Sequence, residues 1–378
     1  MKESSRSQTL AVVVLGCAAL DVTSSTDRPL PGATSEGVVQ FSLGGVGRNV
    51  AEAAHYALPE GDGQVRLVAP LFDDAPGSLI RHKMEQRGLV TQGLFLPSSV
   101  SSSDYSSPVA SLLLDATTSD LLSGVTTMSL VEKALTRTQV LEATQMGAQV
   151  IGFDSNLCSQ AMEALLECKG PEDAHAFSIV FEPTTAAKGI RVIDAIASIQ
   201  RTVGPSQRPL IDVATPNIIE LQAMAKAARE VGLSPAGQSI QTSHIADATL
   251  RTAAELGAPL LPYIGLIFVT IGSRGVLCLF RDGSGKSIAY HEPTQRILEA
   301  QDVKSTTGAG DCFAGAVIAA LASESLRDIK GSATSRAWSL ERVLRLAGTG
   351  NAASLRSLIS HEAVPRPRPD DGPRWRLE

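Results

Sequence analysis

The sequence predicts an α/β fold, a doubly wound and mostly parallel sheet with a small β-lid. Short apolar runs typical of strands alternate with segments of helical periodicity along most of the 378 residues. This alternation indicates a parallel sheet covered by helices on both faces. The composition agrees, because 43% of the residues are hydrophobic but only 4% are aromatic, as expected for aliphatic strands under Ala-rich helices. One stretch that breaks the alternation predicts the lid.

The elements of the main sheet follow from apolar runs of strand length. Six such runs predict strands at 10–15, 65–72, 148–153, 177–182, 210–214 and 264–271. Helical periodicity predicts helices at 75–87 and 159–168, and an Ala-rich helix after each of the strands 177–182 and 210–214. Residues 232–262 indicate a loop or a short helical insertion, to which the sequence assigns no role.

A hairpin pattern supplies the predicted lid. The runs 109–114 and 121–125 flank the turn-rich stretch 116–120, and the segment 22–43 supplies further extended strands. A small β-element of this kind can exclude water from a reaction. We therefore expect the following organisation: a disordered N-terminus at 1–9, one domain at 10–361 with a lid from about 22–43 and 98–127, and a flexible Pro/Arg-rich tail at 362–378.

Composition and charge exclude several classes of function. The net charge is −6 and no Lys/Arg run is interleaved with aromatic residues, so we expect no nucleic-acid partner. Five scattered cysteines without a C-x-x-C pair predict reduced thiols and a cytoplasmic location. Lys2 and Arg6 before the apolar run 10–20 resemble a signal peptide, but a buried first strand explains that run better. No apolar run approaches the ~20 residues that span a bilayer, so we expect no membrane partner.

The segment Thr306-Thr-Gly-Ala-Gly-Asp311 carries the strongest chemical signal. Apolar residues at helical spacing follow it, so the glycines lie where a loop enters a helix N-terminus with free N–H groups. Gly308 and Gly310 let the backbone approach a ligand closely. Such a turn can stabilise a transferring phosphoryl group, while Asp311 takes a proton from the attacking hydroxyl. The alternative is an ordinary helix start capped by Asp311.

Two further segments carry polar residues beside predicted helix starts. Gly44-Gly-Val-Gly-Arg-Asn49 lacks the third glycine of a dinucleotide fingerprint, because Val50 occupies that place. Its small residues could instead lie under a sugar, with Asn49 as donor and acceptor to hydroxyls. In Thr215-Pro-Asn-Ile-Ile-Glu220, Asn217 and Glu220 share one face of a helix start. One carboxylate beside a hydrated Mg²⁺ is chemically reasonable, and a simple helix cap is the alternative.

The glycine-rich turn gives the chain its family resemblance. Gly308-Ala-Gly-Asp311, continuing through Cys312 to Gly315, resembles the C-terminal signature of the PfkB (ribokinase-like) carbohydrate and nucleoside kinases. Similar motifs follow in that family's order from about residue 10 to 357. The resemblance implies a ribokinase-like fold and an ATP- and Mg²⁺-dependent phosphotransferase with an alcohol group as acceptor. It also implies a small-molecule partner and a lid whose strands can pair between subunits in a homodimer.

The same resemblance implies roles for individual residues. The catalytic residues are Asp311 as general base with Gly308, Ala309 and Gly310. The implied acceptor residues are Asp21, Gly44, Gly45, Asn49, Asp154 and Asn156. The implied nucleotide residues are Asn217, Glu220, Thr270, Gly272, Gly275, Thr307 and Asn351, with Glu220 holding Mg²⁺ through water.

A finer resemblance concerns the acceptor. Four segments together resemble the pseudouridine kinase branch, especially the kinase half of eukaryotic pseudouridine-degrading enzymes: 43–49, 153–157, 181–184 and 215–217. The implied reaction phosphorylates the ribose 5′-hydroxyl, and it implies functional pairing with a pseudouridine-5′-phosphate glycosidase. The alternatives are a kinase for another nucleoside or sugar, and a catalytically silent nucleoside-binding member of the family.

Two departures from the family pattern affect specific expectations. Ser305 stands where ribokinase-type members carry an Asp associated with a monovalent cation, which puts potassium activation in doubt. Thr127-Met128 stands where pseudouridine kinases often have Asp-Met, and the preceding 98–108 is unusually rich in Ser and Pro. These lid changes bear on acceptor preference and leave the phosphoryl-transfer residues intact.

Overall fold

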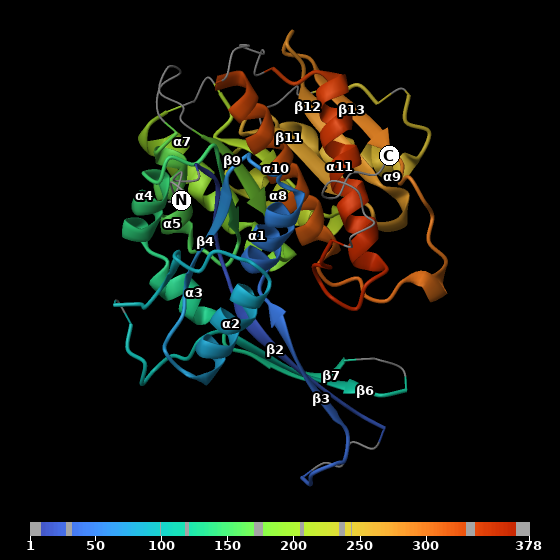
Figure 1. The fold of residues 1–378 in the computed structure, drawn as a ribbon. Helices are drawn as coiled ribbons and strands as arrows, with labels where there is room; N and C mark the ends of the chain where they lie inside the picture. The colour runs from blue at the N-terminus through green and yellow to red at the C-terminus, as the bar shows by residue number, and fades with distance from the viewer. Residues whose placement is uncertain are drawn as a thin grey trace, which may run out of the picture.

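The computed structural model describes residues 9–27, 32–98, 100–117, 121–169, 177–204, 208–233, 239–242, 244–329 and 337–367. These residues form a nine-stranded sheet between two layers of helices, and a four-stranded sheet projects from one end of this body (Figure 1). The predicted disorder at 1–9 lies outside the described residues except for Thr9. The part of the predicted tail beyond 367 also lies outside them.

The large sheet is mostly parallel, as predicted. Its strands lie in the order β13 (Ser287–Glu292), β12 (Val276–Arg281), β11 (Ile264–Thr270), β10 (Ile211–Ala214), β9 (Ser178–Glu182), β8 (Val150–Asp154), β1 (Leu10–Leu15), β4 (Gln64–Pro70) and β5 (Leu94–Phe95). All pairs from β11 to β5 are parallel, while β12 and β13 add antiparallel pairs at one edge. The carboxyl ends of the parallel strands therefore all lie at the same end of the strands, where ligands of such sheets bind.

Helices cover both faces of this sheet. One layer contains α1 (Val46–Ala57), α2 (Ala75–Gln86), α10 (Ala309–Ile329) and α11 (Leu340–Leu358). The other contains α4 (Arg137–Thr144), α5 (Ser159–Glu167), α7 (Arg191–Thr202), α8 (Ile218–Glu230) and α9 (Ala248–Gly257). Shorter helices lie in the connections: α3 (Ser129–Ala134), α6 (Ala186–Gly189) and the 3₁₀ turns Ala258–Leu260, Gly272–Arg274 and Ala300–Asp302.

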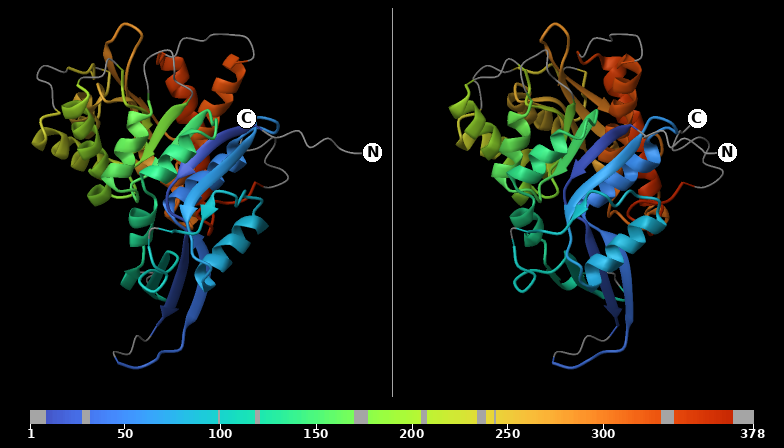
Figure 2. Two further views of the ribbon diagram at one scale, coloured as in Figure 1. Left: turned by 90° about the vertical axis from the view of Figure 1, so that its left-hand side faces the viewer. Right: turned by 60° about the vertical axis from the view of Figure 1, so that its left-hand side comes forward.

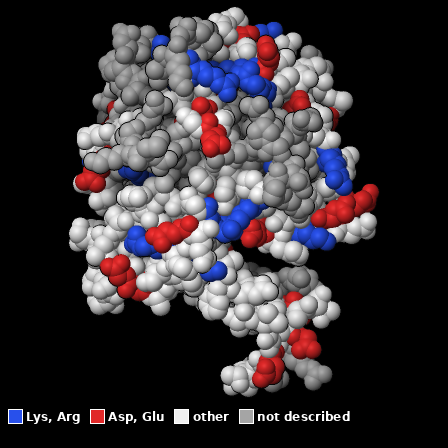
Figure 3. Space-filling model, viewed as in Figure 1, with Lys and Arg blue, Asp and Glu red and all other residues white. Residues whose placement is uncertain are grey.

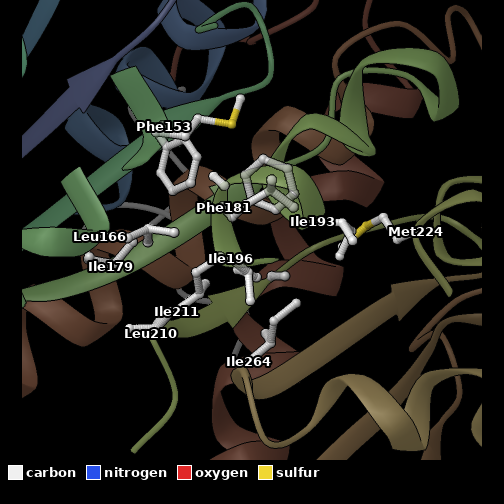
Figure 4. Packing of buried hydrophobic residues seen from close by; sticks show 14 of the residues in the cluster. Phe153, Leu166, Ile179, Phe181, Ile193, Ile196, Leu210, Ile211, Met224 and Ile264 are labelled. Atoms are coloured by element: carbon white, nitrogen blue, oxygen red, sulfur yellow. The ribbon is translucent and has the colours of Figure 1, made fainter. Parts of the chain in front are cut away.

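The alternation of side chains along β1 explains why its sequence is apolar throughout. Val13 and Leu15 belong to one buried cluster, and Val12 and Val14 belong to the cluster on the opposite face. Successive strand residues point to opposite faces, so a strand covered on both sides needs apolar residues at every position. Figure 4 shows the first cluster, in which the rings of Phe153 and Phe181 pack 4.9 Å apart between centroids.

Two segments with weak sequence signals join this body. The unassigned insertion contains α9, whose first turn is capped by Asp247 through Thr249 N and Leu250 N, and Leu250 lies in the core. Val364, inside the predicted flexible tail, is also buried.

Among the described residues, Ala309–Arg327 of α10 is long and apolar enough to cross a membrane by length and composition alone. That stretch packs between α1 and α11 as a core helix.

The projecting sheet contains the predicted hairpin. Its order is β3 (Val38–Gly44), β2 (Ala19–Thr26), β6 (Val109–Asp115) and β7 (Leu121–Thr126), and β6 and β7 are antiparallel. Figure 2 shows it as an arm away from the helical body. Its surface is largely uncharged, with acidic side chains near the tip (Figure 3), and exposed apolar residues include Val38, Val39, Phe41 and Val125. The roles of this sheet as lid and as dimer interface stay predictions.

Candidate active site

The candidate active site lies at the carboxyl edge of the large sheet, where it meets the small sheet and α10. β8 ends at Asp154 and β9 ends at Glu182. β10 leads into the N-terminus of α8, where Glu220 lies. Electrostatic interactions link Glu182 to Asp154, Glu220 and Asp311, so carboxylates from four separate elements gather here. Sequence analysis predicted every member of this group except Glu182.

Asp311 and Asn49 form the centre of the site. Asn49 Nδ2 donates to Asp311 Oδ2 at 2.6 Å, although the residues are 262 positions apart. α1 and α10 approach closely because Gly315 has no side chain: a Cβ there would lie 2.6 Å from Val50 O. Both Asn49 and Asp311 are buried. Asn49 Oδ1 is buried and has no hydrogen-bond partner among the described residues, so the protein itself leaves this acceptor unused.

Burial sets the protonation behaviour of Asp311. Desolvation raises the pKa of Asp311 to about 6, and the negative charges of Asp154 and Glu220 act in the same direction. The hydrogen bond from Asn49 and the positive charge of Arg48 act in the opposite direction. A carboxyl group with this pKa is mostly ionised near neutral pH but is a stronger base than an exposed aspartate, which suits general-base catalysis.

The glycine-rich turn precedes α10 as predicted. Gly308 has φ +86°, and a Cβ there would overlap Ala363 O. Cys312 N makes the first intrahelical bond, to Gly308 O at 2.8 Å. The N–H groups of Ala309, Gly310 and Asp311 therefore have no acceptor within the helix. A Cβ at Gly310 would meet nothing within 4 Å. The turn therefore presents backbone donors beside open space at the positive end of a helix dipole.

The segment Gly44–Asn49, called the acceptor loop below, leads into α1. α1 begins at Val46, so Asn49 lies in the first helical turn. Gly45 caps this helix with φ +89° and packs against Cys17 O. Asp21 lies inside β2, opposite Ser42, and a Cβ on Gly44 would overlap its carboxylate. The structure thus places Asp21 directly beside Gly44.

The carboxylate of Asp154 binds backbone N–H groups from three segments of the chain. Its carboxylate accepts bonds from Cys17 N at 3.0 Å, Gly47 N at 2.7 Å and Asn156 N at 2.8 Å. The side chain is 1% exposed, so these backbone donors replace its hydration. This geometry gives Asp154 a positioning role, because it ties the chain just after β1 to the first turn of α1. A direct contact between Asp154 and an acceptor stays a prediction.

Two site residues were not predicted. Glu182 is buried, and desolvation together with the charges of Asp311 and Glu220 raises its pKa well above the usual range. Lys188 Nζ donates to Asn156 Oδ1 at 2.6 Å. The turn between them contains Thr184 at φ +64°, a conformation that is unusual for a β-branched residue. A carboxylate directly after the last apolar residue of a predicted strand was the available signal for Glu182.

Asn217 and Glu220 form a capping box at the start of α8. Glu220 N donates to Asn217 Oδ1 and Asn217 N donates to Glu220 Oε2, both at 2.9 Å. The structure therefore contains the helix cap that was the alternative interpretation. The cap occupies one carboxylate oxygen of Glu220, and burial raises the pKa of this carboxyl group. A role for Glu220 beside Mg²⁺ stays a prediction.

The remaining predicted nucleotide residues lie on several elements. Thr270 N donates to Pro216 O at 2.9 Å, which joins the end of β11 to the start of α8. Gly272 and Gly275 form the next turn with positive φ angles, and Thr307 N donates to Ser305 Oγ at 3.1 Å. Asn351 lies on α11, and no hydrogen bond within the described part of the chain joins it to the other predicted nucleotide residues. Their nucleotide contacts stay predictions.

Comparisons with known proteins agree with this architecture. A family model described as pfkB family carbohydrate kinase matches residues 123–356, more than half of the chain. A pseudouridine kinase from Arabidopsis thaliana is 27% identical over 354 residues, which cover 82% of this chain and 84% of that protein. Ribokinase from Thermotoga maritima has a TM-score of 0.63 at 19% identity, covering 94% and 96% of the two chains.

A second solved structure, Arabidopsis thaliana ribokinase complexed with ribose and ATP, has a TM-score of 0.62 at 19% identity, covering 94% of this chain and 96% of that one. At this identity the two solved structures show the fold, which is ribokinase-like as predicted. The family match shows more than the fold, and this chain belongs to the pfkB family of carbohydrate kinases.

Proposed function

We propose that this kinase transfers the γ-phosphate of ATP to the 5′-hydroxyl of pseudouridine, with Asp311 as general base. The observation that carries the proposal is the buried Asn49–Asp311 pair at the N-terminus of α10. It combines a proton acceptor, a hydroxyl-binding amide and backbone donors for phosphate in one place. The similarity to a pseudouridine kinase over 82% of the chain supports the acceptor.

In the proposed mechanism the acceptor lies on one side of the Asn49–Asp311 pair and the phosphate of ATP on the other. The acceptor ribose would lie on the acceptor loop, with Asp21 from the small sheet and Asn49 Oδ1 orienting its hydroxyls. Asp311 would take the proton of the attacking hydroxyl. Backbone N–H groups of Ala309 and Gly310 would stabilise the charge on the transferring phosphoryl group, which is the main contribution expected from the protein in such reactions.

The donor set fits magnesium held largely by water and phosphate. Glu220 and Glu182 bring carboxylate oxygens to the same edge of the sheet, and Mg²⁺ prefers oxygen ligands while keeping several waters. Glu220 would hold the ion through water with the oxygen that the helix cap leaves available. Mg²⁺, when bound, would neutralise phosphate charge. A monovalent cation is not part of the proposal, since Ser305 stands where ribokinase-type members carry the Asp associated with such a cation.

The acceptor is tested by competition. Purified protein with ATP and Mg²⁺ receives pseudouridine, uridine, adenosine and ribose at equal concentrations, and the phosphorylated products are separated by chromatography and quantified. The proposal predicts pseudouridine 5′-phosphate as the main product. A main product from another acceptor would reassign the pocket but keep the kinase. Nucleoside binding without any product would instead support the silent family member.

We expect the turnover number to decrease as the pH is lowered through about 6, the pKa of Asp311. The sign follows from the role of the residue, because only ionised Asp311 can accept the hydroxyl proton. Below the pKa the rate should fall about tenfold for each pH unit. The measurement is kcat at saturating substrates between pH 5 and 8. A rate that stays constant over this range would contradict the assignment of Asp311 as base.

We expect Gly44→Ala to raise the KM for the acceptor about tenfold, because losing one hydrogen bond to a charged group costs about 1.5 kcal/mol. A Cβ at this position would overlap the carboxylate of Asp21, so Asp21 must turn away from the acceptor loop. The KM for ATP should not change, because Gly44 belongs to the acceptor side. Steady-state kinetics with each substrate varied in turn give both values. An equal rise of both KM values would contradict this division of the site.

A further inference from the structure

Two buried charged side chains and a third that is mostly buried lie beside the site, and the proposed mechanism does not use them. Arg48 and Glu52 are 2% and 0% exposed, and Arg87 is 13% exposed. Arg48 pairs with Glu52 Oε2, and Arg87 pairs with Glu52 Oε1. Charges are retained in a protein interior only when they are well paired. Glu52 satisfies this condition because each of its oxygens binds a different arginine.

The Arg48 end of this group reaches the small sheet. Arg48 Nε donates to Gly44 O at 3.2 Å, and its Nη2 donates to Leu43 O. These carbonyl groups belong to the last two residues of β3, where the small sheet leads into the acceptor loop. Gly44 also packs against the carboxylate of Asp21. Arg48 therefore fixes the part of the small sheet that carries the predicted acceptor residues.

The Arg87 end reaches the chain segment that supports the glycine-rich turn. Arg87 donates to both carboxylate oxygens of Glu362 at 3.2 Å and to Val364 O. Between these residues, Ala363 O accepts from Ser357 Oγ at 2.9 Å. Ala363 packs so closely against Gly308 that no side chain fits between them. Arg87 therefore fixes residues 362–364, against which the turn at Gly308 packs.

We propose that Arg48, Glu52 and Arg87 form a positioning network. It fixes the acceptor side of the site, at the end of β3, relative to the phosphoryl side, at the glycine-rich turn. The network joins the end of β3 to residues 362–364 through the single carboxylate of Glu52 on α1. Its role in catalysis rests on the proposed kinase function. Reaction rates depend steeply on alignment, because a misplacement of about 1 Å can cost 10²-fold. We assign these residues to positioning, and none of them to contact with substrate.

The proposal predicts that removing a contact at the Arg87 end increases backbone mobility at the Arg48 end. Arg87→Met removes the contacts to residues 362–364, and through Glu52 it should loosen Arg48 and the end of β3. Hydrogen exchange measured by mass spectrometry should then become faster both in peptides covering 305–311 and in peptides covering 38–45, which Arg87 does not touch. Faster exchange confined to the surroundings of Arg87 would overturn the proposal, and this result does not depend on any enzyme activity.

Kinetics provide the second measurement. Arg87→Met should lower kcat at least tenfold, measured at a temperature well below the melting temperature of the variant. Arg87→Lys should recover part of the rate. The matched control is Lys169→Met, which breaks a partly buried ion pair with Asp212 (2.8 Å). Asp212 lies near the amino end of β10, away from the site, so this variant should leave kcat unchanged. Equal kcat in Arg87→Met and the control would overturn the proposal.

A further variant covers the case in which Arg87→Met does not fold. Glu362 is about half exposed, so Glu362→Ala removes only the outer contact of Arg87 and should fold. It should lower kcat several-fold and accelerate exchange in 305–311. Wild-type kcat and exchange in this variant would overturn the network. Wild-type protein that phosphorylates no acceptor would instead refute the proposed function, and the exchange measurement would still decide the network.

Discussion

Asp311→Asn is expected to lower kcat by about 10²–10⁴-fold, the usual cost of removing a general base. Asparagine has nearly the same shape and can still accept the hydrogen bond from Asn49 Nδ2, which spans 2.6 Å in the wild-type protein. It cannot take a proton from the attacking hydroxyl. The KM values for both substrates should change little, because the binding residues stay in place. Steady-state kinetics with ATP and pseudouridine measure this effect.

Two controls show whether the loss is chemical. The melting temperature of Asp311→Asn should equal or exceed that of the wild type, because the substitution removes a buried charge whose ionised form burial disfavours. Glu182→Gln removes a neighbouring buried carboxylate and should cause the smaller loss of rate. A larger loss at Glu182 would transfer the role of base to that residue, and normal turnover in Asp311→Asn would refute the mechanism.

Gly308→Ala is expected to lower kcat by about 10²–10³-fold, the cost of losing a donor that stabilises transition-state charge. Two physical reasons act together. Gly308 has φ +86°, which disfavours any residue with a Cβ, and that Cβ would overlap Ala363 O. The backbone must move, and with it the N–H groups at the start of α10. The melting temperature should fall as well, because the overlap is with backbone.

Gly310→Ala is the matched comparison, since it adds the same methyl group two residues further along the turn. Its Cβ would meet nothing within 4 Å of the protein, so its melting temperature should stay at the wild-type value. Any loss of activity in this variant would come from the space that the proposal gives to phosphate. Wild-type melting temperature and wild-type kcat in Gly308→Ala would contradict the close packing of Gly308 and Ala363.

The main architecture could be predicted because its causes are local. A run such as Leu10–Leu15 is apolar at every position, since both faces of β1 are covered, and such runs are visible in a sequence. The hairpin β6–β7 follows from turn residues between two strand-like runs. The turn at Gly308–Asp311 could be located for a similar reason, because a glycine-rich loop before an apolar helix has a recognisable pattern.

The contacts within the site could not be predicted because they depend on packing between distant segments. The sequence suggested Asn49 and Asp311 for different tasks, and only the close approach of α1 and α10 brings their side chains together. Arg48 and Arg87 look like ordinary surface residues of helices until Glu52 is placed between them. Asp154 likewise gains its role from backbone N–H groups more than 100 positions away.

The most direct test of the central claim is the rate of ADP formation by the wild-type protein with ATP and Mg²⁺, measured with and without pseudouridine. The proposed mechanism predicts ADP formation that depends on pseudouridine and yields one pseudouridine 5′-phosphate for each ADP. An equal rate of ADP formation in both reactions, or ADP without a phosphorylated nucleoside, would contradict transfer to the 5′-hydroxyl of pseudouridine.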